Sequence, residues 1–131
     1  MLIHLVDRRI DHAEFAHLGA QGQLGKYPIH FHMTRDTMRG TLVEGVSVHD
    51  SGNRFITVHS TNGVTLRSNV GYKAIGHGFF LEDGDEVENF YDGNLGILTM
   101  PGKLIPSDAY AAIFWTQNPA NIWRGNYALK G

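Results

Sequence analysis

Short stretches of alternating apolar and polar residues recur along the chain, and the period of two is typical of β-strands. The first clear stretch covers residues 27–33. One face of the predicted strand takes Ile29, Phe31 and Met33. The other face takes His30 and His32. Similar alternation returns at residues 55–59 and at residues 79–82. An apolar face and a polar face on each strand, repeated along the chain, indicate a solenoid of stacked coils.

The stretches keep a common register. Residues 42–49 match residues 65–72, so that Leu42 falls on Thr65, and the same offset carries His59 onto Glu82. An asparagine marks a second repeated position. It occurs at Asn69, Asn94 and Asn126, each time followed by an apolar residue and a small residue. Asparagine tolerates left-handed backbone at turns, and stacked asparagines can hydrogen-bond between coils.

Two offsets longer than the one between Leu42 and Thr65 connect the remaining strands. One carries His32 onto His59, and the other, the longest, carries Glu82 onto Thr116. We attribute the longest spacing to an inserted Pro/Gly loop at about residues 99–110.

Units of about 20–30 residues with Gly and Asn turns cannot bury a core singly, but they can when stacked. We therefore predict an all-β fold, a right-handed parallel β-helix of about five coils. The alternative is an antiparallel sandwich of the same strands. One predicted inward column consists of Ile29, Ile56, Phe79 and Ile113, and the neighbouring inward column consists of Phe31, Val58, Leu81 and Trp115. One predicted outward column consists of His30, Thr57, Phe80 and Phe114, and the other consists of His32, His59, Glu82 and Thr116.

The length of 131 residues and the 42% hydrophobic content suit one domain over residues 1–131. A strand-like run at residues 2–6 comes first. Since the chain starts and stops within a repeat without an obvious polar cap, we expect a segment of a longer solenoid. Flanking coils or end-to-end self-association would then cover its open ends.

Composition excludes several classes of partner. A net charge of -2 gives no basic footprint for nucleic acid, and no apolar run is long enough for membrane insertion. The chain has no cysteine, which excludes a disulfide framework and a thiolate zinc site. The eight histidines are the unusual count.

The predicted outward column of His32, His59 and Glu82 is a candidate divalent metal site. Adjacent coils lie about 4.8 Å apart, so imidazole and carboxylate groups in one column can converge on an ion. The alternative is a hydrogen-bonded ladder on a solvated sheet face. A calcium site would instead use the oxygen ligands of one acidic turn. These are Glu82, Asp83, Asp85 and Glu86, and a solvated turn is the alternative for them.

Cleavage of a polysaccharide needs a proton donor and either a carboxylate partner or a base with charge neutralisation. Glu82 or Asp83 is the candidate acid, and His59 or His77 is the candidate base. Candidate groups for holding the substrate are Arg54, His30, His32 and Asp36. By the offset that carries Leu42 onto Thr65, Arg54 and His77 lie one coil apart, and a structural turn pair is the alternative interpretation for them.

Five ordered stretches cover nearly the whole chain and carry a family resemblance. They are Gln23-Leu24-Gly25-Lys26-Tyr27-Pro28-Ile29-His30-Phe31-His32-Met33, Asn53-Arg54-Phe55-Ile56-Thr57-Val58-His59-Ser60-Thr61-Asn62-Gly63, Gly76-His77-Gly78-Phe79-Phe80-Leu81-Glu82-Asp83-Gly84, Leu104-Ile105-Pro106-Ser107-Asp108 and Phe114-Trp115-Thr116-Gln117-Asn118-Pro119. Together they resemble the β-helix region shared by cell-migration-inducing hyaluronidase, transmembrane protein 2 and fibrocystin-L. Arg35 departs from the glycine usual in that family, whereas Asp36 is kept.

The resemblance implies a parallel β-helix and an extracellular or cell-surface setting. For two of the relatives it also implies hyaluronan depolymerisation with a calcium requirement. Fibrocystin-type relatives carry the same region without a known hydrolase role. Two hypotheses follow for this chain. It is a glycoside hydrolase or polysaccharide lyase-like enzyme acting on an acidic glycan, or it is a non-catalytic structural or glycan-binding module.

Overall fold

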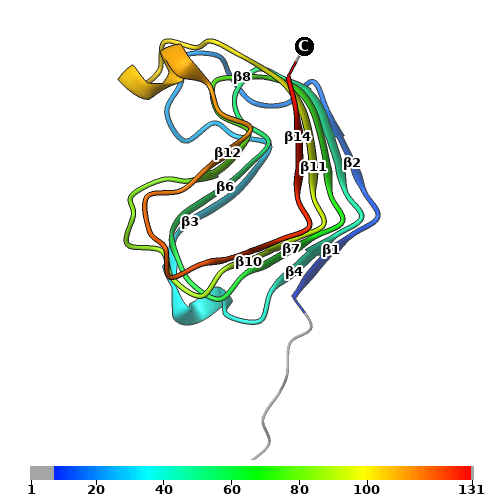
Figure 1. Cartoon of the computed structure of the whole chain (residues 1–131), viewed down its shortest axis with the longest axis vertical. Coiled ribbons are helices and arrows are strands. Elements are labelled where there is room, and N and C mark those ends of the chain that lie inside the picture. The colour runs from blue at the N-terminus through cyan, green and yellow to red at the C-terminus, as the bar shows by residue number, and fades with distance from the viewer. Residues whose placement is uncertain (1–7, 131) are drawn as a thin grey trace, which may run out of the picture.

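The chain winds into three parallel sheets in a computed structural model that describes residues 8–130 (Figure 1). The first sheet contains, in spatial order, β1 (Arg9–Asp11), β4 (Leu42–Glu44), β7 (Thr65–Arg67), β10 (Phe90–Asp92) and β13 (Ile122–Arg124). The second contains β2 (Glu14–Ala16), β5 (Ser47–Ser51), β8 (Val70–Ile75), β11 (Leu95–Met100) and β14 (Tyr127–Leu129). The third contains β3 (Ile29–Arg35), β6 (Ile56–Thr61), β9 (Phe79–Leu81) and β12 (Phe114–Trp115).

Each coil visits the three sheets in turn, and every pair of neighbouring strands is parallel. The predicted parallel β-helix is therefore confirmed, and the antiparallel sandwich is wrong. The strand expected at residues 2–6 lies outside the described residues. Two short 3₁₀ helices, η1 (Asp36–Met38) and η2 (Pro106–Tyr110), interrupt the coils. No helix within the described part of the chain has the length and apolar character needed to cross a membrane.

The predicted register is confirmed over the first three coils. Leu42 pairs with Thr65, and His32 pairs with His59, as the repeat offsets required. The apolar face of β3 ends earlier than predicted. Met33 is 56% exposed, because its backbone is left-handed and the pairing with β6 becomes irregular after His32.

The predicted register of β12 is wrong by one residue. Phe114 pairs with Phe79 and Trp115 pairs with Phe80, whereas the sequence offset had aligned Phe114 with Phe80. Phe114 therefore faces inward, where its ring stacks on that of Phe79 at 4.9 Å between centroids. Trp115 and Phe80 lie on the outer face. The reason is the length of the 101–113 segment, which no strand pattern in the sequence fixes.

The column that the second sheet turns inward consists mostly of small residues. Phe15, Val48, Gly71, Gly96 and Ala128 follow one another there. An added Cβ on Gly71 would overlap the ring of Phe55, and one on Gly96 would overlap Cγ2 of Ile113. The two glycines thus leave room for apolar side chains that enter from the corner beside the third sheet.

Asparagine ladders hold the coils together at the corner between the first and second sheets. Asn69 Nδ2 donates to Asn94 Oδ1 at 2.9 Å, and Asn94 Nδ2 donates to Asn126 Oδ1 at 2.9 Å. The predicted stacking of these asparagines is therefore confirmed. The sequence pattern missed a second ladder, in which Asn89 Nδ2 donates to Asn121 Oδ1 at 3.1 Å at the corner before the first sheet.

The corner between the first and second sheets has constant length. In all five coils the second-sheet strand begins five residues after the first-sheet strand. Variation in length is confined to the two corners that flank the third sheet. The longest segment there is 101–113, which carries η2 and projects at the upper left of Figure 1.

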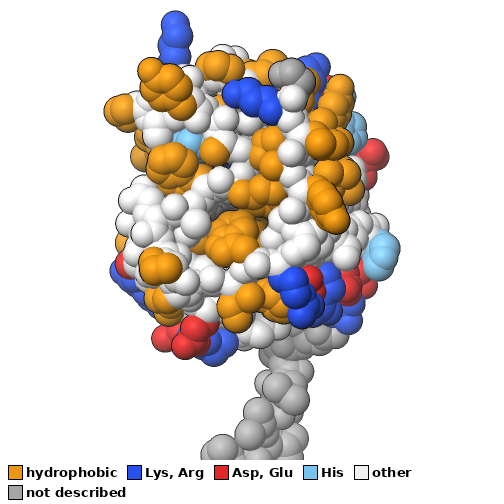
Figure 2. All heavy atoms as spheres, in the orientation of Figure 1, with side chains coloured by type: hydrophobic (Ala, Val, Ile, Leu, Met, Phe, Trp, Pro, Cys, Tyr) orange, Lys and Arg blue, Asp and Glu red, His pale blue; other side chains and the backbone are white. Residues whose placement is uncertain are grey.

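The end of the β-helix formed by the last coil carries many apolar side chains. Figure 2 shows hydrophobic side chains gathered over this end. Phe114 and Trp123 line an open hollow of about 340 Å³, and Tyr127 and Leu129 are exposed. Within residues 8–130, β13 and β14 pair on one side only. Coverage of this end by a further coil or by self-association stays a prediction.

Candidate functional site

The outer face of the third sheet brings three predicted site residues together. His30, His59 and Glu82 each offer a side-chain ligand atom, and these atoms lie within 4.8 Å of one another. We call these three residues the His/Glu cluster. The alternation of β3 buries Ile29 and Phe31 and turns His30 outward. Glu82 follows β9 directly, and its backbone N–H donates to Val58 O at 3.1 Å, which extends the ladder by one residue.

The structure places His30 in the cluster where the sequence predicted His32. The imidazole rings of His30 and His59 stack with centroids 6.0 Å apart and planes 10° apart. His32 meets both rings edge-on, at 5.0 Å and 4.9 Å, and its side chain is exposed. The predicted pairing of His32 with His59 in the ladder is correct, but it is His30 whose ligand atom lies within 4.8 Å of those of His59 and Glu82.

Hydrogen bonds fix the two histidines of the cluster. His30 Nδ1 lies 3.2 Å from Gly25 O, so this nitrogen carries the proton and donates, while Nε2 is buried without a partner. His59 Nε2 lies 2.8 Å from Asp83 Oδ2, and its Nδ1 lies 3.7 Å from Glu82 Oε2. Each ring is held through one nitrogen, which leaves the other directed into the cluster.

Burial changes the ionisation of the cluster. It raises the pKa of the Glu82 carboxyl, an effect that His59 and Arg54 oppose and that Asp83 reinforces. Burial also lowers the pKa of His30, since a charged imidazole loses hydration there. Tyr27, whose hydroxyl lies 3.5 Å from Glu82 Oε1, has a raised pKa because of burial and then of the Glu82 charge.

Two buried oxygen atoms in and beside the cluster lack hydrogen-bond partners among residues 8–130. Thr57 lies between His30 and Phe80 in the ladder, is fully buried, and has an unpartnered Oγ1. Glu82 Oε2 is unpartnered as well. Buried polar groups without partners are uncommon in folded proteins and need a specific explanation.

The acidic turn that the sequence offered as a calcium site uses its oxygens internally. Both oxygens of the buried Glu86 accept backbone N–H groups, from Ser60, Asp83 and Gly84. Asp85 pairs with Arg35 and accepts from the Ser60 hydroxyl. Glu86 therefore caps the turn. One ligand atom each of Asp83, Asp85 and Glu86 lies within 4.8 Å of the others, so a calcium site at this turn stays a prediction.

Arg54 and His77 lie in a separate buried group beneath the 101–113 segment. Arg54 Nη1 forms an ion pair with Asp108, and both side chains are 1% exposed. His77 is fully buried, its Nδ1 accepts from Ala112 N at 2.9 Å, and its Nε2 lies 3.0 Å from Ser107 Oγ. Burial, followed by the Arg54 charge, lowers the pKa of His77 to about 4. This geometry favours the structural interpretation of both residues.

Asp36 also lies outside the cluster. It is in η1, its side chain is 68% exposed, and it pairs with Arg39 and accepts from Asn62. The sequence interpretation assigned no site role to Tyr27, Thr57 or Asp108. Thr57 stood in the predicted outward column, so its burial between two aromatic rings could have been suspected. Asp108 stood in a stretch that carries the family resemblance, but no strand pattern assigned it a partner, because it comes from the segment with no strand register.

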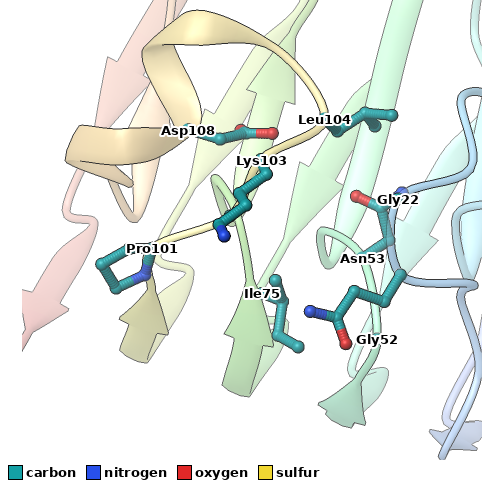
Figure 3. Close-up of a pocket in the computed structure, with 10 residues that line it drawn as sticks. Gly22, Gly52, Asn53, Ile75, Pro101, Lys103, Leu104 and Asp108 are labelled. Atoms are coloured by element: carbon teal, nitrogen blue, oxygen red, sulfur yellow. The ribbon is translucent and has the colours of Figure 1, made fainter.

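A pocket of about 230 Å³ lies under the same segment, away from the His/Glu cluster. Figure 3 shows Pro101, Lys103 and Leu104 above Ile75 and the turn at Gly52 and Asn53, with Asp108 at one wall. The Asp108 carboxylate is already engaged by Arg54. The polar lining of the pocket thus consists mainly of backbone groups, side-chain amides and one lysine, and these groups indicate no specific reaction or ligand.

Comparison with known proteins identifies the family. A family model described as CEMIP beta-helix matches residues 1–131. Cell surface hyaluronidase CEMIP2 of Homo sapiens is 45% identical over 105 residues, which are 76% of this chain and 8% of that protein. Cell migration-inducing and hyaluronan-binding protein of Homo sapiens is 42% identical over 105 residues, again 76% and 8%. Fibrocystin-L of Mus musculus is 38% identical over 128 residues, 97% of this chain and 3% of that protein.

The chain thus spans less than a tenth of the length of each of these relatives. The resemblance to the hyaluronidase and fibrocystin-L group is confirmed. Since the family model covers every residue, the chain belongs to the CEMIP beta-helix family.

Proposed function

We propose that this chain binds an acidic glycan of the hyaluronan class on the outer face of its third sheet and cleaves it at the His/Glu cluster. The observation that carries the proposal is that three of the eight buried side-chain polar atoms without a hydrogen-bond partner in the described part of the chain lie on neighbouring strands of this face. They belong to His30, Thr57 and Glu82. Leaving one such group unmet costs about 1–3 kcal/mol, so several together support a bound ligand. The names of two relatives, a hyaluronidase and a hyaluronan-binding protein, support the glycan class.

The groups required for cleavage lie within contact of one another. Glu82, His59 and Asp83 provide two carboxyl groups and an imidazole, joined by the distances of 3.7 Å and 2.8 Å at His59. Such a set can donate one proton and accept another, or neutralise charge during an elimination. His77 and Asp36 are left out of this machinery because their side chains engage other residues.

The test combines binding and chain length. Hyaluronan oligosaccharides are titrated into the protein by calorimetry, and long hyaluronan is incubated with it and sized by gel electrophoresis, with calcium and with a chelator. Neutral dextran is the control polymer. We expect binding and shortening of hyaluronan only. Glu82→Gln should abolish shortening, whereas Glu14→Gln, the same substitution on an exposed position of β2, should leave it unchanged.

The outcomes separate the two function classes. Shortening that Glu82→Gln abolishes supports an enzyme with its site on this face. Binding without shortening supports the second candidate, a non-catalytic glycan-binding module. The contacts of Arg54 and His77, which are with other residues of the chain, favour this candidate. The absence of both binding and shortening, in protein shown to be folded by circular dichroism, would overturn the proposal.

A further inference from the structure

We propose that His30, His59 and Glu82 form a binding site for a transition-metal dication of the Zn²⁺ class. Their ligand atoms lie within 4.8 Å of one another, and they come from three successive coils. Two imidazoles and one carboxylate are the ligand set of many zinc sites that keep a further position open for water or substrate. No other three-residue group of mixed imidazole and carboxylate ligands occurs in the described residues.

The distances suit a small ion. Two ligands on tetrahedral bonds of about 2.0–2.2 Å lie roughly 3.3–3.6 Å apart. His59 Nδ1 and Glu82 Oε2 are 3.7 Å apart, so a small rotation of either side chain brings both onto one ion. His30 Nε2, buried and without a hydrogen-bond partner, is the remaining ligand atom.

Hydrogen bonds outside the cluster orient the two imidazoles as in metal sites. A histidine ligand typically donates its other N–H to a carbonyl or carboxylate, which fixes the tautomer and the ring. His30 meets this condition through Gly25 O at 3.2 Å. His59 meets it through Asp83 Oδ2 at 2.8 Å. In its neutral form, each ring then directs the lone pair of its other nitrogen into the cluster.

The unpartnered oxygen is the independent observation that points to a ligand. Glu82 Oε2 has no hydrogen-bond donor in the part of the chain that the structure describes, although the side chain is only 15% exposed. Thr57, fully buried beside His30, offers a second oxygen without a donor. A dication would satisfy the Glu82 oxygen directly, and a water on the ion could reach the threonine.

The donor set distinguishes this ion from calcium. Calcium takes six to eight oxygen ligands, whereas imidazole nitrogen suits zinc, copper, nickel and related ions. The nearby oxygens of Glu86 and Asp85 already accept protein N–H and O–H groups. The proposal rests on the cluster alone and is independent of glycan binding. With the ion bound, Glu82 and His59 Nδ1 are ligands and do not exchange protons with a substrate, so the cleavage proposed above uses the metal-free cluster. If glycan does bind, a dication here would offset the repulsion between its carboxylates and those of Glu82 and Asp83.

The test measures metal without glycan. The full chain, prepared without a polyhistidine tag and stripped with a chelator, is titrated with Zn²⁺ by calorimetry and with Co²⁺ by visible absorption. We expect one ion at this site and little competition from excess Ca²⁺. His30→Gln and Glu82→Gln should each weaken Zn²⁺ binding by at least about 100-fold, and Asp83→Asn by about 10-fold. His32→Gln, on the same strand and exposed, should change it less than about 3-fold.

Circular dichroism and thermal melting test whether each variant is folded. If His30→Gln does not fold, Glu82→Gln provides the test of the site. Absence of Zn²⁺ binding by the wild type would overturn the proposal. So would binding that His30→Gln and Glu82→Gln both leave intact, or binding that only His32→Gln weakens. Zinc binding without any hyaluronan binding would uphold this site and overturn the proposed function, so the two failures are distinguishable.

Discussion

Replacing Asp108 by asparagine should destabilise the protein far more than the same change at an exposed ion pair. Arg54 and Asp108 are each 1% exposed, and Arg54 Nε already lacks an acceptor. Asparagine keeps the shape but removes the negative charge, so the guanidinium stays buried against the ring of Phe80, 4.3 Å from its centroid. Breaking a buried pair on one side costs about 3–5 kcal/mol. We expect about 3 kcal/mol, because the remaining amide oxygen still accepts one hydrogen bond.

The assay is urea unfolding at pH 7, followed by the fluorescence of the two tryptophans, one of which contacts His77. Asp36→Asn is the matched control, since Asp36 also pairs with an arginine but both partners are exposed. Exposed pairs contribute about 0–1 kcal/mol. The double variant Arg54→Met with Asp108→Asn should recover part of the loss, because neither charge of this pair is then left buried. A cost for Asp108→Asn no greater than that for Asp36→Asn would refute the reasoning.

Three other perturbations test the fold. Asn94→Ala removes a side chain that donates two hydrogen bonds and accepts two, and urea unfolding should show a loss of about 3 kcal/mol; a loss below about 1 kcal/mol would contradict the ladder. Gly96→Ala, whose new Cβ would overlap Ile113, should lower the free energy of unfolding by about 1–3 kcal/mol, and an unchanged thermal midpoint would argue against the close packing. The pKa of His77 is about 4 in the folded protein against an ordinary 6.5, so the unfolded state binds an extra proton as the pH falls below 6.5. The contribution of His77 to the free energy of unfolding is therefore complete above pH 6.5 and falls by up to about 3 kcal/mol toward pH 4. Urea unfolding at pH 7 and pH 4.5 measures it, and the same pH dependence in His77→Gln would assign the effect to other groups.

The sequence could predict the coils because their signals are local and repeated. The alternation in β3 and β6 and the recurring asparagines each occur at a fixed place in the coil, so one offset aligned Leu42 with Thr65 correctly. The register of β12 could not be found in this way. It depends on the exact length of the 101–113 segment, and the stacking of Phe114 on Phe79 decides it only in three dimensions.

The site was predicted less well than the fold. Strand alternation placed His30, His59 and Glu82 on one face, where the structure brings their ligand atoms within 4.8 Å of one another. It could not choose between His30 and His32, which share that face, because the choice depends on how each ring is held. The partner of Arg54 was out of reach, since Asp108 comes from a segment whose position over the sheet follows from tertiary packing.

The constant corner between the first and second sheets has a consequence for how such a protein can be altered. Each coil crosses this corner in the same number of residues, and the asparagine ladder at Asn69, Asn94 and Asn126 requires that spacing. One residue inserted there would turn every following side chain of that strand to the opposite face. The two corners beside the third sheet already differ in length from coil to coil. New loops grafted at those corners would therefore reshape the surface around the His/Glu cluster while the stacked coils keep their register.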